Sequence, residues 1–389
     1  MFTLIDLTFF ANKEFASGKE LVTSQAASLG YVEHLKNCVA IEVVKHMDKE
    51  AHLVINEVPY HFFKNNNRFF SFPLKTFLYI RKRQPEIVLA QGLSFPFQIL
   101  MLRLFAKSKT RIIAQHHGEI CPRSAVKRIF ERLADKYIDA YLFNTPEYAE
   151  ERLQLGLISY QDKILLLPEG SNTFKKKDKK EARMLAGIQS EGTVFLWVGR
   201  LNNNKDPLTI LRAFAKYLEF NADAHLYMIY QSEELLWAII DLVSQNDLLS
   251  AHVHLLGRRD RTELEMWYNA ADYFITGSHH EYGAFALLEA MACGCVPIAT
   301  NIPTMQQYLQ HGETGFLFPP GDVNVLSLLL TILDQYDVEE MSRKVAAHFR
   351  ANYSFEKIAA ELCDICTALL VKQPHYVGNS VVDPVSSNA

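Results

Sequence analysis

Two carboxylates, Glu281 and Glu289, lie eight residues apart across a predicted junction between a loop and a helix. The apolar run 271–276 before them is typical of a buried strand, and 285–293 has the pattern of a helix that ends at Gly294. A helix N-terminus offers unpaired N–H groups and a positive dipole end, which favour a phosphate. Carboxylates beside a phosphate need hydroxyl donors, and sugars and ribose supply them. The segment predicts a nucleotide-sugar site; the alternative is a solvated loop residue and a charge on a helix surface.

Two cations follow another predicted strand. Arg200 comes directly after the apolar run 193–198 and Gly199, and Lys205 precedes Asp206-Pro207, which is a helix-start signal. Ligands of α/β sheets bind beyond the carboxyl ends of strands. The guanidinium fork and the ammonium point charge both suit phosphate oxygens. Arg200 and Lys205 are therefore candidate phosphate ligands, and the alternative is a surface arginine and a solvated lysine.

These motifs resemble family 4 of the retaining glycosyltransferases, the group 1 glycosyl transferases. The family's donor site has a Glu, seven residues and a second Glu, followed by a Leu-Glu-Ala-Met-Ala-like helix and a Gly; Glu281, Glu289 and Gly294 occupy those positions. The stretch 315–322 matches another family hallmark, and the resemblance is strong from 193 to 370 and weak before. It implies the α/β GT-B fold: two Rossmann-like parallel-sheet domains facing a central cleft, with a C-terminal helix crossing back to the N-terminal domain.

The resemblance also implies roles for the candidate residues. Arg200 and Lys205 would stabilise the diphosphate as it leaves, Glu281 would orient the sugar hydroxyls, and Glu289 would bind the ribose diol. Arg258 and Arg259 are candidates for the base pocket, with a solvated loop as the equal alternative.

Gly283, Ala284 and Phe285 lie where backbone N–H groups would meet the donor. The family usually has Glu-Gly-Phe-Gly, whereas this chain has Glu281-Tyr282-Gly283-Ala284, so its glycines are displaced. Because Ala284 carries a Cβ, we expect it not to adopt the positive φ that is open to glycine.

Two further candidates lie in the first half of the chain. His116 and His117 follow the predicted strand 111–115, and adjacent side chains of extended backbone point to opposite faces. The family's His before a Gly selects His117 as a contact to the donor sugar; the alternative is a loop histidine without a role. Gly18 lies where the family has a glycine pair in the loop after the first strand, near the donor phosphates.

Length and patterning predict the domains. A chain of 389 residues with 49% hydrophobic and 22% charged residues is globular and long enough for two domains, and its net charge of −4 argues against a nucleic-acid partner. Apolar runs alternate with helical patterns in both halves, which predicts two parallel sheets covered by helices. We predict an N-terminal acceptor-side domain at 1–171, a donor domain at 172–354, a cross-over helix at 355–372 and a loose tail at 373–389. The basic run 175–180 is predicted to be a solvated face.

Several expectations concern metals, compartment and surface. The chain has no Asp-x-Asp, so we expect no metal and no cofactor, with cations neutralising the diphosphate instead. It also lacks GxGxxG and GxxxxGK motifs, and its six scattered cysteines predict free thiols in a reducing compartment.

With no signal-peptide pattern at its start, we expect a cytoplasmic protein. The stretch 64–83 interleaves basic and aromatic residues, so it is either a peripheral contact with the inner face of a membrane or an ordinary packed helix and loop.

The sequence-based hypothesis is a metal-independent, retaining hexosyltransferase. It would move a hexosyl unit from a UDP- or GDP-sugar to a hydroxyl of a glycan, lipid-linked or small-molecule acceptor, as in bacterial cell-surface glycan or glycolipid synthesis. The alternatives are a GT-B-like nucleotide-sugar epimerase, a phosphorylase, and a non-catalytic subunit that binds nucleotide-sugars.

Overall fold

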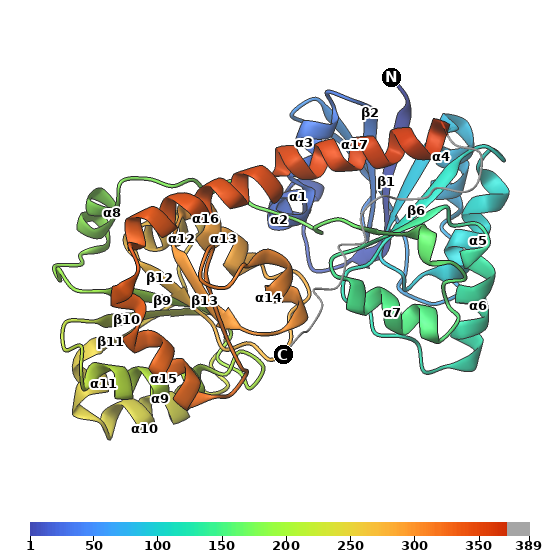
Figure 1. The fold of residues 1–389 in the computed structure, drawn as a ribbon. Coiled ribbons are helices and arrows are strands. Elements are labelled where there is room, and N and C mark those ends of the chain that lie inside the picture. The colour runs from blue at the N-terminus through green and yellow to red at the C-terminus, as the bar shows by residue number, and fades with distance from the viewer. Residues whose placement is uncertain (372–389) are drawn as a thin grey trace. The chain divides into compact units, whose positions relative to one another are not determined.

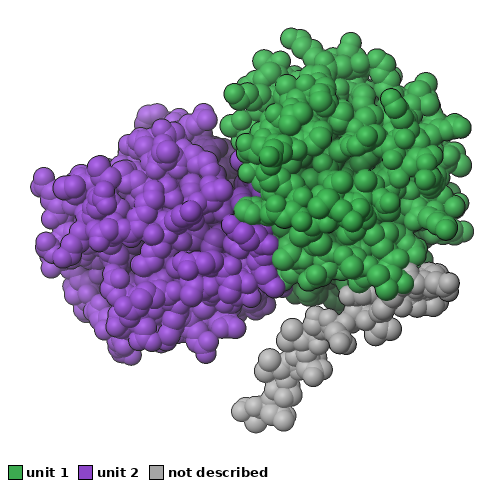
Figure 2. All heavy atoms as spheres, turned by 90° about the horizontal axis from the view of Figure 1, so that it is seen from above, with its two compact units in different colours: residues 1–25, 31–169, 359–389 green, residues 26–30, 170–358 purple. Residues whose placement is uncertain are grey.

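Two separate β-sheets organise the chain in the computed structural model, which describes residues 1–371. Among the described residues, unit 1 comprises 1–25, 31–169 and 359–371, and unit 2 comprises 26–30 and 170–358 (Figures 1 and 2). The predicted tail, 373–389, lies outside the described residues.

Unit 1 is built on an eight-stranded sheet of order β3-β4-β2-β1-β5-β6-β7-β8. Its strands are β1 (Thr3–Asn12), β2 (Ala40–Met47), β3 (Ala51–Ile55), β4 (Val58–Phe63), β5 (Ile87–Gln91), β6 (Arg111–Gln115), β7 (Ala140–Phe143) and β8 (Ile164–Leu166). Its helices are α1 (Gly18–Ser24), α3 (Tyr31–Leu35), α4 (Leu74–Arg83), α5 (Pro96–Phe105), α6 (Ala125–Asp135) and α7 (Pro146–Gln154), with a 3-10 turn at Gln161–Lys163.

Unit 2 has a six-stranded, wholly parallel sheet of order β11-β10-β9-β12-β13-β14. Its strands are β9 (Val194–Gly199), β10 (His225–Tyr230), β11 (Val253–Gly257), β12 (Tyr273–Ile275), β13 (Val296–Thr300) and β14 (Phe316–Phe318). Its helices are α2 (Ala26–Leu29), α8 (Lys179–Ala186), α9 (Pro207–Leu218), α10 (Leu236–Ser244), α11 (Asp247–His252), α12 (Arg261–Ala270), α13 (Phe285–Cys293), α14 (Pro303–Tyr308), α15 (Val323–Thr331) and α16 (Val338–Asn352), with a 3-10 turn at Leu333–Gln335.

Helices cover both faces of the unit 2 sheet, as the apolar strands require. Buried side chains of α8, α12, α13, α14 and α16 form one core with one face of the sheet, and those of α9, α10, α11 and α15 form a second core with the other. The last helix, α17 (Phe355–Val371), begins in unit 2 and continues from Ala359 in unit 1. There the free thiols of Cys363 and Cys38 are joined by a hydrogen bond.

The prediction of two parallel sheets is confirmed, and unit 1 adds one antiparallel pair at its edge. Strand β3 pairs with β4 antiparallel, through a two-residue turn at Asn56 and Glu57. Both turn residues have positive φ, 48° and 70°, as the tight primed hairpin turns require. Glutamate stands where such turns usually have glycine, so the usual hairpin signal is missing from the sequence.

The sequence over 18–29 has the pattern of one continuous helix, but the structure divides this segment into α1 and α2. Helix α1 ends at Ser24, and residues 26–30 belong to unit 2. There the carbonyl of Ala27 accepts a hydrogen bond of 2.8 Å from the Ser171 N–H. Gly30 packs so closely on the Phe355 ring that an added Cβ would lie 2.3 Å from it.

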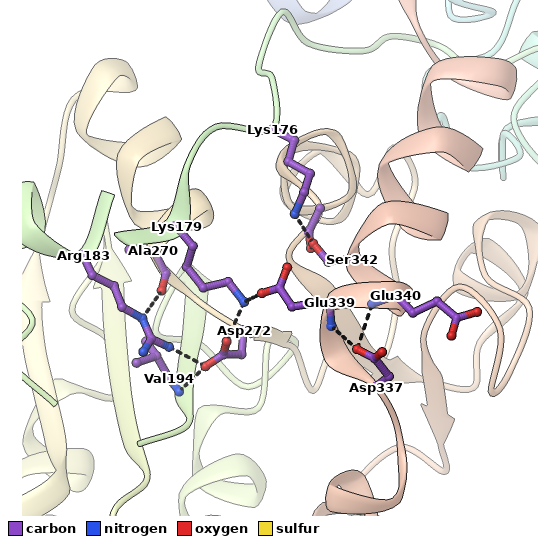
Figure 3. Close-up of polar contacts among 11 residues, drawn as sticks. Lys176, Lys179, Arg183, Val194, Ala270, Asp272, Asp337, Glu339, Glu340 and Ser342 are labelled. Carbon is purple, nitrogen blue, oxygen red and sulfur yellow. Dashed lines mark hydrogen bonds and ion pairs between the residues drawn. The ribbon is translucent and has the colours of Figure 1, made fainter. Parts of the chain in front are cut away.

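The lysine-rich run 175–180 is exposed, as predicted, at every position except Lys179, and both Lys176 and Lys179 make contacts within unit 2 (Figure 3). Lys179 forms ion pairs with Asp272 at 2.8 Å and with Glu339 at 2.6 Å. The same Asp272 carboxylate accepts from Arg183 at 2.6 Å and from the Val194 N–H at 2.8 Å. These contacts attach α8 to the start of β9 and to α16.

Among the helices of residues 1–371, none combines the length and the apolar character that a membrane crossing requires.

Candidate functional site

The carboxyl ends of β9 and β12 mark the place where the unit 2 sheet reverses its strand order. Successive strands β9, β10 and β11 extend to one side, and β12, β13 and β14 extend to the other. Open α/β sheets bind ligands at this kind of switch point. The loops that follow these two strands carry Arg200, Lys205 and Glu281.

Hydrogen bonds join these two loops into one rigid surface. The carbonyl of Asn204 accepts from the His279 N–H at 2.8 Å, and the Asn204 side chain bonds the backbone N–H and carbonyl of His280, both at 3.0 Å. Asp206, the N-cap of α9, also bonds the His279 ring at 3.1 Å. The backbone at the switch point is therefore positioned before any ligand binds.

Lys205 and Glu281 are in direct contact across these loops. The Lys205 ammonium forms an ion pair with the Glu281 carboxylate, and the two side chains are 22% and 14% exposed. The Glu281 carbonyl accepts a hydrogen bond of 2.6 Å from Thr304. The structure thus brings together the residue predicted to hold a phosphate and the residue predicted to orient a sugar.

Arg200 stands at the carboxyl end of β9 with an exposed side chain. The following residue, Leu201, is completely buried and anchors the loop. Within residues 1–371 the Arg200 guanidinium forms no ion pair with an acidic side chain, so its fork is open to an external anion.

Glu289 lies in the second turn of α13 and is only 9% exposed. Its carboxylate accepts from Arg261 at 3.2 Å and from the Tyr268 hydroxyl at 3.2 Å. Burial raises the pKa of Glu289, and the positive charge of Arg261 opposes that rise. A carboxylate has about four acceptor sites, so Glu289 can accept from a diol while it keeps both protein partners.

Neither partner of Glu289, Arg261 or Tyr268, was predicted from the sequence. The candidates there were Arg258 and Arg259, and Arg259 pairs with Glu263 at 3.6 Å. Arg261 and Tyr268 are seven residues apart on α12, so they lie on one face of that helix, two turns apart. That spacing is a signal that could have identified them together.

The expectation that Ala284 avoids positive φ is wrong. Ala284 is the N-cap of α13 with φ 42° and ψ 38°, in the left-handed region, and it is buried. No side chain caps the first turn of α13. The N–H groups that follow Ala284, beginning with Phe285, therefore keep the anion-binding capacity of an uncapped helix start.

His117 follows β6 in unit 1 and is held by side chains on both ring nitrogens. Its Nε2 bonds Gln91 Oε1 at 2.6 Å, and its Nδ1 lies 3.3 Å from a Glu169 carboxylate oxygen. The Gln91 amide donates to the buried Asp6 carboxylate at 2.7 Å, which fixes its oxygen toward His117. Desolvation opposes charging of the ring, but the hydrogen bond and charge of Glu169 outweigh it and raise the pKa of His117.

Gly18 opens α1 instead of lying in a loop, and it is buried. A Cβ added there would lie 2.6 Å from the Phe62 ring. Close packing within unit 1 therefore explains this glycine without a phosphate.

Metal ligands do not gather anywhere in residues 1–371: no group of three or more His, Cys, Asp or Glu side chains is arranged to hold an ion.

Comparisons with known proteins bear on the family and on the fold. Residues 178–346, which span most of unit 2, match the family model of the group 1 glycosyl transferases. The chain is 30% identical over 213 residues to a D-inositol 3-phosphate glycosyltransferase 2 of Catenulispora acidiphila, an alignment covering 48% of this chain and 47% of that protein. It is 26% identical over 289 residues to the corresponding enzyme of Thermobispora bispora, covering 69% and 63%. The chain thus spans about half to two thirds of the length of these relatives.

Solved structures show the same fold along almost the whole chain. A glycosyltransferase of Rickettsia africae superposes with a TM-score of 0.73 at 14% identity, covering 96% of this chain and 99% of that one. Anabaena HepE in complex with UDP-glucose superposes with a TM-score of 0.66 at 15% identity, covering 94% and 100%. The chain therefore has the GT-B fold, and within its second unit residues 178–346 are similar to the group 1 glycosyl transferases.

Proposed function

We propose that this protein is a retaining glycosyltransferase that moves a hexosyl unit from a nucleotide-diphosphate sugar to an acceptor hydroxyl. The observation that carries the proposal is the contact between Lys205 and Glu281 at the switch point of unit 2. Arg200 and the uncapped start of α13 belong to the same unit. The relatives described above are glycosyltransferases, and one structural neighbour is in complex with UDP-glucose, so a UDP-sugar is the first donor to test. A GDP-sugar is the second.

The reaction breaks the bond between the anomeric carbon and the diphosphate oxygen and forms a bond from that carbon to the acceptor oxygen. In a front-face substitution the acceptor proton passes to the leaving phosphate, so the configuration is retained. Negative charge builds on the diphosphate as its bond breaks. Arg200 and Lys205 would stabilise that charge, which lowers the barrier because the interaction strengthens in the transition state. No metal takes part in this proposal.

Glu281 and Glu289 have separate tasks in the proposed site. Glu281 would accept hydrogen bonds from the hydroxyls of the transferred sugar, and Lys205 would turn from Glu281 toward the phosphates. Glu289 would accept from the ribose diol, with Arg261 and Tyr268 holding its carboxylate in place. Backbone groups of Gly283, Ala284 and Phe285 would contact the donor.

His117 would contact the donor sugar only by exchanging one of its two protein partners. Its imidazole carries hydrogen-bond partners on both nitrogens, Gln91 and Glu169. We propose that the ring serves as a cationic donor in this network, and that a sugar hydroxyl competes with Glu169, whose contact is the longer one.

The acceptor is proposed to be a glycan, a lipid-linked sugar or a small polyol, and the enzyme to act in the cytoplasm. The sequence-based rivals make different products. An epimerase would interconvert the sugar without an acceptor, a phosphorylase would need inorganic phosphate, and a binding subunit would turn nothing over.

The first experiment is a thermal-shift panel of UDP-, GDP- and ADP-sugars with Arg200→Ala as the control variant. A ligand at a hundred times its Kd adds about 2.7 kcal/mol to the free energy of unfolding, which raises Tm by several degrees. We expect one donor class to shift the wild type and to shift the variant much less.

The second experiment incubates that donor with an acceptor panel and follows the anomeric proton of the product by NMR. A product with the anomeric configuration of the donor supports the proposal. An inverted product contradicts retention, and a donor that is epimerised without any acceptor contradicts transfer.

A further inference from the structure

Helix α6 of unit 1 presents an apolar stripe to solvent although its inner face is already packed. Val126, Ile129 and Leu133, at helical spacing, are 52%, 53% and 40% exposed. Phe130, one turn from Val126 and beside the stripe, packs edge-on against Phe97, with ring centroids 6.0 Å apart, and the buried face of the helix is formed by Ala134 and Asp135. The fold thus gives no reason for the outer stripe, because a surface helix needs only one apolar face.

The charges around this stripe are of one sign. Arg123, Lys127 and Lys136 are exposed along α6 and its ends. The acidic residues of the helix point inward: Glu131 pairs with Arg152 at 3.0 Å, and the Asp135 side chain is 1% exposed. The solvent-facing side of α6 is therefore both apolar and basic.

The same character continues on the neighbouring segments. Helix α5 packs between α4 and α6 on one side of the unit 1 sheet (Figure 1). Phe70, in the loop before α4, is 58% exposed and stacks edge-on against Phe130 of α6, and Leu104 of α5 is 73% exposed. Residues 64–83 and 93–110 contain no Asp or Glu at all. We call the exposed side chains of α6 together with Phe70 and Leu104 the α6 surface.

We propose that the α6 surface docks unit 1 onto an anionic lipid bilayer. A helix that lies flat in a membrane interface places apolar side chains into the acyl boundary and lysines or arginines among anionic headgroups. A protein partner would have to offer a surface that is both apolar and acidic. An anionic bilayer always has both, because its apolar acyl chains lie directly beneath its negatively charged headgroups. The proposal is independent of any glycosyl transfer, since it concerns only the affinity of the free protein for lipid.

The test is sedimentation of the full chain with sucrose-loaded vesicles, without any sugar donor. Vesicles of phosphatidylcholine alone are compared with vesicles containing 30% phosphatidylglycerol, at about 0.1 M and about 1 M salt. We expect binding to the anionic vesicles and little to the neutral ones. Binding should fall steeply at the higher salt, because the Debye length shrinks from about 10 Å to about 3 Å.

Two variants separate the charges from the apolar stripe. Replacing Arg123, Lys127 and Lys136 by Gln should weaken partition on the order of a hundredfold, since each basic side chain contributes about fivefold, or about 1 kcal/mol. Ile129→Ser with Leu133→Ser should weaken it at least about tenfold. All five side chains are exposed, so Tm should stay within a few degrees of wild type, and that measurement excludes misfolding as the cause.

The matched control is α8 of unit 2, which also exposes apolar and basic side chains but carries acids beside them. Met184 and Leu185 are 72% and 65% exposed, next to Lys180 and Glu181. Met184→Ser with Leu185→Ser and Lys180→Gln should leave partition unchanged.

Three results would overturn the proposal. The first is a wild type that binds neither kind of vesicle, or both equally. The second is an equal loss of binding in the α8 variant. The third is a wild-type dimer, without lipid, that the Ile129→Ser and Leu133→Ser change converts to a monomer, which would make the α6 surface an interface between two copies of this chain.

Discussion

The pairing of Lys205 with Glu281 shapes how the site would respond to each part of a donor. A diphosphate must compete with the Glu281 carboxylate for the Lys205 ammonium. Sugar hydroxyls, in contrast, can donate to Glu281 and help to release Lys205. In the proposed site, nucleotide binding and sugar binding would therefore depend on different residues of the same cluster.

The variants Glu281→Gln and Glu289→Gln should show which residue nucleotide binding depends on and which residue sugar binding depends on. Glu281→Gln should leave UDP or GDP binding unchanged or slightly tighter, because Lys205 loses its competing carboxylate, while binding of the matching nucleotide-sugar weakens. Glu289→Gln should weaken both ligands by roughly tenfold to a hundredfold, since a hydrogen bond to a charged group contributes about 1.5–3 kcal/mol. Calorimetry with each ligand measures both effects. Equal losses of both ligands in both variants would show that the roles are misassigned.

His117 is a doubly hydrogen-bonded imidazole whose partners both accept. The Asp6 carboxylate fixes the Gln91 amide so that its oxygen faces Nε2, and Glu169 faces Nδ1. Two acceptors need two N–H donors, which is the cationic ring. The raised pKa of His117 has the same cause, since its carboxylate neighbours outweigh the cost of desolvation.

The stability contributed by His117 should depend on pH in a defined sense. A folded-state pKa above the ordinary value of 6.5 gives stability that is fully present below pH 6.5 and is lost as the pH rises through the raised pKa. The difference in free energy of unfolding between wild type and His117→Gln should therefore shrink above pH 6.5. Denaturation curves across that range measure it. His348, whose pKa burial lowers, is the control: the difference for His348→Gln should shrink on acidification instead. If the difference in free energy of unfolding between wild type and His117→Gln does not change with pH, the His117 ring is not charged in the folded protein.

Among the elements, the segment 175–187 is held in part by one carboxylate that accepts from two of its cations. Asp272, directly before β12, accepts from Lys179, Arg183 and the first N–H of β9 (Figure 3). Its side chain is 12% exposed and those of Lys179 and Arg183 are 21% and 17% exposed. Removing the carboxylate leaves two partly buried cations without their shared partner.

Asp272→Asn should therefore destabilise unit 2 by about 2–4 kcal/mol, somewhat less than breaking a fully buried pair. Chemical denaturation followed by fluorescence measures the loss. Lys180→Gln changes an exposed neighbour on the same helix and should cost less than about 0.5 kcal/mol. A similar small loss for Asp272→Asn would mean that the network in Figure 3 contributes little to stability.

Helix α13 begins on a strained residue. Ala284 adopts φ 42°, which costs a residue with a Cβ about 1–2 kcal/mol relative to glycine. Ala284→Gly would remove that strain but would add chain entropy to the unfolded state and remove a buried methyl group. These effects oppose each other, so we expect Ala284→Gly to change the free energy of unfolding by less than about 0.5 kcal/mol. Ala290→Gly, in the buried middle of the same helix, should cost about 1 kcal/mol or more. Equal losses at both positions would contradict the strained start.

At the scale of the whole molecule, the sequence predicted what depends on local pattern. Alternating apolar runs and helical stretches gave both sheets, the start of α9 at Asp206-Pro207 and the full extent of α17. The β3–β4 hairpin was missed because Glu57 occupies a left-handed turn position where glycine is usual. The break after α1 was missed because it is set by contacts of Ala27 with residues far along the chain.

For the candidate site, too, local pattern predicted some features, and contacts between distant residues decided the others. Motif spacing selected Lys205, Glu281 and Glu289 as candidates, and the structure brings the first two together because loops after neighbouring strands meet at one edge of a sheet. Spacing could not show that Lys205 and Glu281 pair with each other, nor that Arg261 and Tyr268 hold Glu289. Those contacts depend on side-chain directions, which only the packed structure determines.

The last prediction concerns how the whole molecule neutralises a leaving diphosphate. Arg200 and Lys205 come from the loop after β9, and α13 adds the positive end of its dipole. Because these groups supply the positive charge, turnover should survive EDTA without added metal. Arg200→Ala should lower kcat/KM by about tenfold to a hundredfold, and Arg200→Lys should restore only part, since the planar fork is lost. Steady-state rates beside melting temperatures measure this. Loss of activity in EDTA with rescue by Mn²⁺, or near-normal rates in Arg200→Ala, would move the neutralising charge away from these residues.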